Sequence, residues 1–228
     1  MYLKFFTFLI ISTNLFADAS IRPISTYSIV AYDEKTGELG VAVQSHWFSV
    51  GTVVPWAKAG VGAVATQSIA EPSYGPKGLA LMEQGIPADE ALQSLLLKDS
   101  GENVRQIGMV DAKGNVGAHT GARCIRYAGH KIGKHYSVQA NIMEKPTVPN
   151  AMSNAFENTK GDLAERMLAA LEAAEKEGGD LRGKQSAALL VVSGTPTGDV
   201  WKDRIVDIQI GDHENPLGEL RRLLNISK

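Results

Sequence analysis

The sequence contains a single cysteine, Cys124, so the chain of 228 residues cannot form an internal disulfide bond. Its fold must therefore be stabilised by the hydrophobic core alone. Cys124 falls within residues 122–129, which we predict to be a strand. A small buried hydrophobic side chain is a commoner role for a cysteine in such a place than a nucleophile. The sequence thus gives little reason to expect thiol chemistry.

Clusters of one charge sign are also missing. The chain has 23 basic and 25 acidic residues, a formal net charge of −2, and the two signs are interspersed. Binding to a nucleic acid or to an anionic membrane surface requires clustered Lys and Arg side chains. We therefore expect no nucleic-acid partner.

Patterns typical of metal and phosphate sites are absent. The five histidines are scattered and lack acidic or cysteine ligands at helical spacing. The segment from His130 to His135 is interpreted as a solvated loop. The glycine-rich segments lie within predicted strands and not between a strand and a helix, so they do not form a phosphate-binding loop. We expect no metal and no cofactor.

The only long apolar run lies at the start of the chain. Lys4 is followed by a mainly apolar run over residues 5–11, and Ala17 and Ala19 occupy the −3 and −1 positions before Ser20. This pattern is typical of a signal-peptidase site. A membrane anchor or a buried first helix is the alternative, but the run is too short to span a bilayer.

We accordingly predict a signal peptide over residues 1–19 and one domain over residues 20–228, because no linker divides the remainder. The protein is then expected to be exported, to the periplasm or outside the cell, with no membrane association after the signal peptide is removed.

Hydrophobic periodicity predicts alternating groups of strands and helices. Strands are expected over residues 26–32, 37–45, 52–56, 58–68, 105–121 (a hairpin), 122–129, 135–143, 185–193 and 203–210. Helices are expected within residues 79–96 and over 148–158, 163–176 and 215–226. Two mostly antiparallel sheets, each with one face on the other sheet and one face on helices, would bury all the apolar faces. The predicted fold is a four-layer αββα sandwich of the α+β class.

Seven segments resemble, in chain order, a known family: STYSIVAYD, GELGVAVQS, AGVGAVATQS, EPSYGPKGL, GAHTG, YSVQANIM and GKQSAALLVV. They are similar to domain-of-unknown-function family 1028, which is placed in the N-terminal-nucleophile (Ntn) hydrolase superfamily. The resemblance runs from Thr26 to the last predicted helix and implies an Ntn-hydrolase-like fold. The family has no assigned substrate, so the resemblance implies no particular reaction.

The resemblance suggests a role for Thr26, which stands at the head of the first predicted strand. A threonine hydroxyl needs a base to become a nucleophile. When threonine is the first residue, its own α-amine can serve, with an unperturbed pKa of about 7.7–8.0. Signal-peptide removal would leave residues 20–25 in front of Thr26, so a second cut is required. Ser20 is a weaker candidate because Pro23 interrupts any strand that leads from it.

The superfamily resemblance places two further residues, Gln44 and Ser45, beside the nucleophile. Gln44 stands where proteasome-type relatives have an aspartate, and the predicted strand over residues 52–56 lacks the lysine expected there. Lys58 is nearby, in a predicted loop. These departures argue against ordinary proteasome-like peptidase action.

Three more residues complete the predicted site. Gln67 and Ser68 fall where backbone N–H groups form an oxyanion hole in the superfamily, and Asn141 falls on a loop near the nucleophile. Asn141 has an alternative role, which is to satisfy a backbone group at a strand end. We predict that Thr26, Ser45, Gln67 and Asn141 converge on one pocket.

Two functions remain open at this point. The first is an exported Ntn-type amidohydrolase that cleaves a small amide or peptide-like bond with a threonine nucleophile. The second is a catalytically silent Ntn-fold protein that binds a ligand or assembles with partners, in which Thr26 is an ordinary interior strand residue. The expected partner is a small-molecule or peptide-like substrate, and the sequence leaves open whether the chain forms a homo-oligomer.

Overall fold

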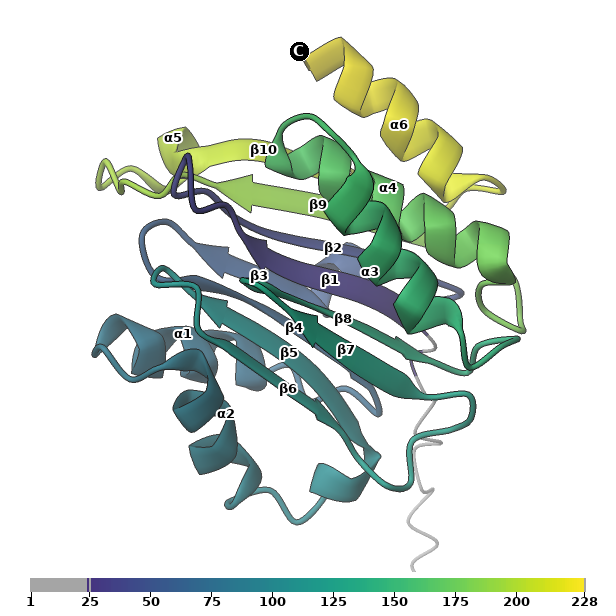
Figure 1. The fold of residues 1–228 in the computed structure, drawn as a ribbon, viewed down its shortest axis with the longest axis horizontal. Coiled ribbons are helices and arrows are strands. Elements are labelled where there is room, and N and C mark those ends of the chain that lie inside the picture. Colours follow the sequence, from purple (N-terminus) through teal and green to yellow (C-terminus); the bar gives the residue numbers. More distant parts are fainter. Residues whose placement is uncertain (1–23, 25, 228) are drawn as a thin grey trace, which may run out of the picture.

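The computed structural model describes residue 24 and residues 26–227, and Figure 1 shows their arrangement. The predicted signal peptide, residues 1–19, lies outside the described residues. Within the described part of the chain, no helix is both long and apolar enough to span a membrane.

The larger of two sheets contains six strands in the order β10-β9-β2-β1-β8-β7, and all neighbours are antiparallel. The strands are β1 (Thr26–Tyr32), β2 (Leu39–Ser45), β7 (Gly129–Gly133), β8 (Tyr136–Asn141), β9 (Ser186–Val192) and β10 (Arg204–Ile210). β1 lies between β2 and β8, so the strand that begins with Thr26 is an interior strand of this sheet.

The smaller sheet contains four antiparallel strands in the order β3-β4-β5-β6. They are β3 (Pro55–Lys58), β4 (Gly62–Ser68), β5 (Arg105–Asp111) and β6 (Val116–Thr120). β3 is an edge strand with a proline at its start, which is where a residue without an N–H group is tolerated.

Helices cover the outer face of each sheet (Figure 1). α3 (Val148–Asn158), α4 (Leu163–Glu177) and α6 (Pro216–Ser227) pack on the larger sheet, and α1 (Tyr74–Glu83) and α2 (Ala88–Leu96) pack on the smaller one. Short helices are η1 (Val50–Thr52), η2 (Glu102–Val104) and α5 (Val200–Asp203). The four-layer αββα sandwich predicted from the sequence is confirmed.

Strand alternation explains how the layers are joined. In β1, Tyr27 and Ile29 belong to the apolar cluster shared with α3 and α4, whereas Val30 belongs to the cluster between the two sheets. Val30 lies opposite Val41, and Ser28 lies opposite Val43, as the predicted hairpin requires. The head of β1 therefore directs Thr26 and Ser28 towards the smaller sheet.

Three predictions about secondary structure are wrong. Residues 121–128, which include Cys124, form a loop and not a strand. His130 lies in β7 and not in a loop. The pattern does not indicate this strand because β7 is an edge strand, whose side chains are mostly half-exposed and show no apolar alternation. Residues 50–52 form η1, so β3 begins only at Pro55.

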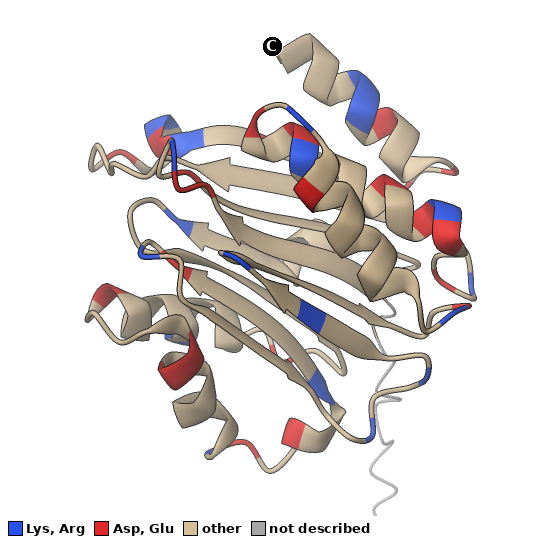
Figure 2. Cartoon of the chain, in the orientation of Figure 1, with Lys and Arg blue, Asp and Glu red and all other residues tan. Residues whose placement is uncertain are grey.

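Charged side chains lie mainly on the helices and loops, where both signs are mixed (Figure 2). The central strands carry few of them, as expected for strands that are covered on both faces.

Candidate functional site

Thr26 lies where the head of β1 meets the ends of its two neighbours. Ser45, the last residue of β2, and Asn141, the last residue of β8, are its partners on either side. Thr26 Oγ1 is 3.3 Å from Ser45 Oγ. The Thr26 side chain is fully buried.

Gln67 of β4, in the smaller sheet, also contacts Thr26. Gln67 Nε2 donates a hydrogen bond to the Thr26 carbonyl at 3.3 Å, and Asn141 Nδ2 lies 3.5 Å from that oxygen. Thr26, Ser45, Gln67 and Asn141 are thus brought together. They are enclosed between the sheets, and all four side chains are fully buried.

Gln106 of β5, which the sequence analysis missed, links these groups. Its Oε1 accepts hydrogen bonds from Gln67 Nε2 at 2.7 Å and from Asn141 Nδ2 at 2.9 Å. Its Nε2, which carries two hydrogens, lies within hydrogen-bond distance of Thr120 Oγ1 and of the carbonyls of Gly129 and Ala140. One buried amide therefore connects β5 with four other strands, β4, β6, β7 and β8. The signal in the sequence was a glutamine directly before the apolar residues 107–110 of a predicted buried strand.

The polar layer continues away from Thr26. Ser28 Oγ donates to Gln67 Oε1 at 2.6 Å and accepts from Gln139 Nε2 at 3.1 Å. Because these groups satisfy one another, they fix the rotamers of the residues around Thr26 and hold the two sheets in one relative position.

Ser68, the last residue of β4, connects the site to the chain that precedes β1. Its φ angle of 70° lies in the left-handed region. Its N–H group donates to the Ile24 carbonyl at 3.2 Å, and its carbonyl accepts from the Ile24 N–H at 2.7 Å. Thr26 Oγ1 donates to the same Ile24 carbonyl at 2.9 Å. The Ile24 oxygen therefore lies between the Thr26 hydroxyl and the Ser68 amide.

Two predicted positions are wrong. Gln44 lies opposite Tyr27, and its amide contacts the Tyr27 hydroxyl on the helix-facing side of the sheet, away from Thr26. Because Gln44 and Ser45 are adjacent in a strand, only one of them can face Thr26. Lys58 ends β3, where its Nζ forms an exposed ion pair with Glu83 at 2.6 Å.

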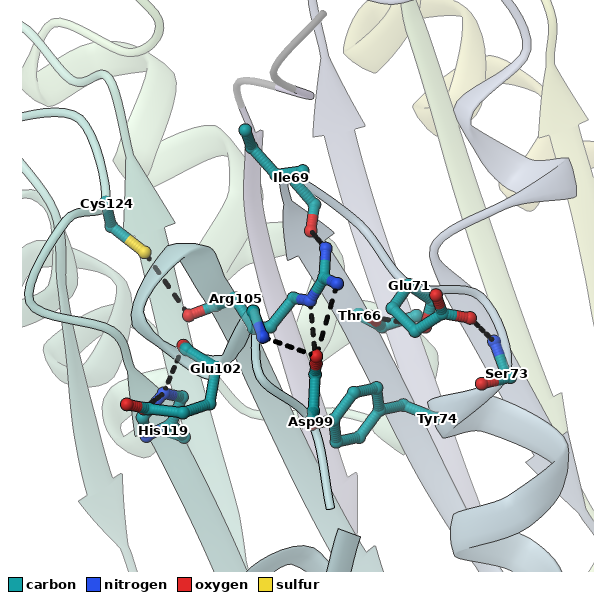
Figure 3. A network of polar contacts seen from close by, with 11 residues as sticks. Thr66, Ile69, Glu71, Ser73, Tyr74, Asp99, Glu102, Arg105, His119 and Cys124 are labelled. Atoms are coloured by element: carbon teal, nitrogen blue, oxygen red, sulfur yellow. Dashed lines mark hydrogen bonds and ion pairs between the residues drawn. The ribbon is translucent and has the colours of Figure 1, made fainter. Parts of the chain in front are cut away.

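A second polar network joins Arg105, Asp99 and the Ile69 carbonyl (Figure 3). Arg105 Nε contacts Asp99 at 2.8 Å, and Arg105 Nη1 donates to the Ile69 carbonyl at 2.7 Å. The Arg105 hydrogen bond lowers the pKa of the Asp99 carboxyl. Arg105 thereby ties the segment after β4 to the segment that follows α2.

Cys124 lies beside this network. Its thiol donates to the Arg105 carbonyl at 3.2 Å, and the Ser68 side chain also hydrogen-bonds it. Burial raises the pKa of the thiol, which disfavours the reactive thiolate. Among the residues that the structure describes, no group of three His, Cys, Asp or Glu side chains is placed to hold a metal ion.

Comparison with known proteins decides the family. The family model described as "Family of unknown function (DUF1028)" matches residues 26–220. The chain belongs to the DUF1028 family. The solved structure of protein SPO2555 from Silicibacter pomeroyi, itself assigned to DUF1028, is 30% identical, with a TM-score of 0.80 over 89% of this chain and 86% of that one.

A more distant likeness is to Anbu (ancestral beta-subunit) from Yersinia bercovieri. It is 11% identical, with a TM-score of 0.40 over 88% of this chain and 93% of that one. No curated protein matches the chain. The DUF1028 match begins at Thr26, the first residue of β1.

Proposed function

We propose that this DUF1028 protein is an exported amidohydrolase of the Ntn type, in which Thr26 becomes the first residue and its hydroxyl attacks an amide carbonyl. Export is inferred from the predicted signal peptide. The Ntn assignment is inferred from the αββα sandwich together with the position of a threonine at the head of an interior strand.

One observation carries the proposal, namely the position of the Ile24 carbonyl oxygen. It lies 2.9 Å from the Thr26 hydroxyl and 3.2 Å from the Ser68 backbone nitrogen. An acyl-transfer site needs a nucleophile and an oxyanion donor at one carbonyl. A substrate carbonyl in the place of the Ile24 carbonyl would meet both.

The proposed reaction needs a free α-amine on Thr26. That amine accepts the hydroxyl proton as Oγ1 attacks the carbonyl carbon, while the Ser68 N–H group stabilises the oxyanion. The C–N bond then breaks, the proton passes to the leaving nitrogen, and water hydrolyses the resulting ester. In the uncut chain, the nitrogen of Thr26 is an amide and cannot act as the base.

Three neighbours support the nucleophile in this proposal. Gln67 and Asn141 hold the Thr26 carbonyl and so orient the residue. The Ser45 hydroxyl, 3.3 Å from Oγ1, can relay a proton between the hydroxyl and the amine. None of these groups is charged, so the site relies on the terminal amine for its base.

The alternative is a catalytically silent protein that binds a ligand or assembles with partners. The complete burial of Thr26 favours it, because an uncut chain offers a substrate no access to the hydroxyl. The two functions differ in whether the chain is cut before Thr26.

The N-terminus of the exported protein tests the proposal. We expect intact-mass analysis to find a chain that begins at Thr26, whereas Thr26→Ala should begin at Ser20 because it cannot cut itself. Thr36→Ala, at an exposed turn, is the matched control and should be processed normally. A wild-type chain that begins stably at Ser20 at every pH tried would favour the silent alternative.

If the chain is cut, amide hydrolysis should increase with pH as the α-amine loses its proton, with a midpoint near its ordinary pKa of about 7.7–8.0. Acylation of the Thr26 amine should abolish hydrolysis although the hydroxyl remains.

A further inference from the structure

The edge of β4 that faces β3 is only partly covered by β3. β3 pairs with β4 as far as Ala65, and the next contact on this side is from the Thr66 N–H to the Val54 carbonyl. At Ser68, Ile24 takes the place of a partner strand and forms two antiparallel backbone hydrogen bonds. The end of β4 therefore pairs with a residue, Ile24, that belongs to neither sheet.

The Ile24 side chain fits into the core at this place. It is 5% exposed and belongs to the apolar cluster between the sheets, together with Val43, Val54 and Ala65. The position thus combines two backbone hydrogen-bonding groups, an enclosed apolar site and the Thr26 hydroxyl within 2.9 Å of the segment's carbonyl oxygen. These are the elements by which a protein recognises an extended peptide as an added strand.

We propose that Ile24 marks the substrate site, and that the processed protein binds an extended peptide-like chain with a branched aliphatic side chain in the place of Ile24. This inference rests on the proposed function, because in the wild-type chain the cut before Thr26 is what removes Ile24 from the site. The substrate forms an antiparallel bridge with Ser68, and its aliphatic side chain enters the apolar site.

The reacting bond follows from this placement. Thr26 Oγ1 forms an ester with the carbonyl carbon of the aliphatic residue, and the amide C–N bond on its C-terminal side breaks. The proton taken from Oγ1 goes to the leaving amine, and one water then restores Oγ1 and releases a carboxylic acid. The cleaved bond is therefore the one directly after the aliphatic residue.

Binding can be tested on the full-length chain. The probe is a fluorescein-labelled peptide, Ser-Ile-Arg-Pro-Ile-Ser amide, which copies residues 20–25. Ile24→Gly removes the side chain that occupies the site in the intact chain. By fluorescence anisotropy, we expect this variant to bind the probe at least tenfold more tightly than the wild-type chain does. Leu181→Gly, at an exposed turn, is the control and should bind like wild type.

Two altered probes distinguish specific, strand-like binding from nonspecific binding of the peptide. N-methylation of the second isoleucine of the probe removes the N–H group that would donate to the Ser68 carbonyl, and replacing that isoleucine by aspartate puts a charge into the apolar site. Each change should weaken binding at least tenfold. Equal binding of all three probes, or no binding by Ile24→Gly, would overturn the inference.

Loss of binding must be distinguished from loss of folding. Circular dichroism checks that Ile24→Gly is folded, and Ile24→Asp provides a second variant that should release the segment by charge. If both unfold, the exported chain that begins at Thr26 is used directly. Specific binding without hydrolysis by the chain that begins at Thr26, in which the amine is free, would overturn the proposed function and leave the peptide site standing. Hydrolysis of small amides without specific probe binding would support the proposed function and overturn the peptide site.

Discussion

Thr26 is the residue at which the two sheets and the preceding chain meet. Its hydroxyl contacts Ile24 and Ser45, and its carbonyl contacts Gln67 and Asn141. A buried hydroxyl in such a setting contributes to stability as well as to the proposed chemistry, so substitutions at Thr26 need both readouts.

Thr26→Ala is expected to lower the free energy of unfolding by about 1–2 kcal/mol, because it removes a buried hydrogen-bonded hydroxyl. Thr26→Ser keeps the hydroxyl and should cost less. Urea unfolding measures the stability, and amide hydrolysis by each exported variant measures the function. We expect hydrolysis to persist in Thr26→Ser and to be lost when Oγ1 is lost, and equal hydrolysis by both variants would rule out Oγ1 as the nucleophile.

Gln106 is the residue whose loss should most disturb the polar layer. Gln106→Leu leaves the amides of Gln67 and Asn141 without their shared acceptor in a buried place, and we expect a loss of about 2–4 kcal/mol in the free energy of unfolding. Gln93→Leu, on the exposed face of α2, is the matched control and should change stability by less than about 0.5 kcal/mol. A loss in Gln106→Leu no greater than in the control would show that the layer contributes little.

At the scale of elements, Arg105 joins the end of β4 to the region after α2. Arg105 is bonded both to Asp99 and to the Ile69 carbonyl, so it positions the residues next to Ser68. The Tyr74 hydroxyl at the start of α1 also donates to Asp99, at 3.1 Å. One carboxylate thus holds α1 and β5 together.

The stability contributed by Asp99 should depend on pH. Arg105 lowers the pKa of Asp99 in the folded chain, so this stability is present above the unfolded pKa of about 3.9 and is lost as the pH decreases through the folded pKa. We expect Asp99→Asn to cost about 1–2 kcal/mol at pH 7. In urea titrations from pH 7 to pH 3, the difference in free energy of unfolding between wild type and Asp99→Asn should decrease below about pH 4. A difference that stays constant would mean that Asp99 acts through packing alone.

Most of the strands predicted from the sequence have residues that are buried in a regular pattern. β1, β2, β4 and β9 carry mainly apolar or small side chains, and their positions follow from that pattern. β7 escaped prediction because it is an edge strand, where backbone pairing with β8 and not side-chain burial determines the conformation.

The candidate site was predicted only in part. Ser45 and Asn141 stand beside Thr26 because they end the two strands that pair with β1, and the resemblance to a known family supplied that pairing. Gln106 was missed because its contacts cross from one sheet to the other, and no local pattern specifies which side chains meet there. The bridge between Ile24 and Ser68 has no signal in the local pattern either.

At the scale of the whole molecule, the larger sheet is the most protected part. β1 and β2 are covered by helices on one face and by the smaller sheet on the other, and their residues are almost all fully buried. β10 is an edge strand with mostly exposed or half-exposed side chains. Local opening should therefore begin at the edges and reach the centre last.

Hydrogen exchange should show this order. We expect the amides of Val30 and Val41 to exchange at the rate of global unfolding, and those of β7 and β10 to exchange at least tenfold faster at neutral pH. Mass-spectrometric or NMR detection would resolve the strands. Similar protection in the edges and in the centre would indicate that the sandwich opens only as one unit.

The shortness of β3 has a consequence for handling and storage of the cut protein. Once residue 24 is gone, the end of β4 presents an N–H group and a carbonyl, both at Ser68, with no strand beside them. An uncovered strand edge pairs with any extended chain, including a loose end of another copy. The uncovered edge at Ser68 would admit a substrate, but it would also let copies of the cut protein bind one another. We therefore expect the cut protein to self-associate and inhibit itself at high concentration, and the uncut precursor to remain monomeric at the same concentration.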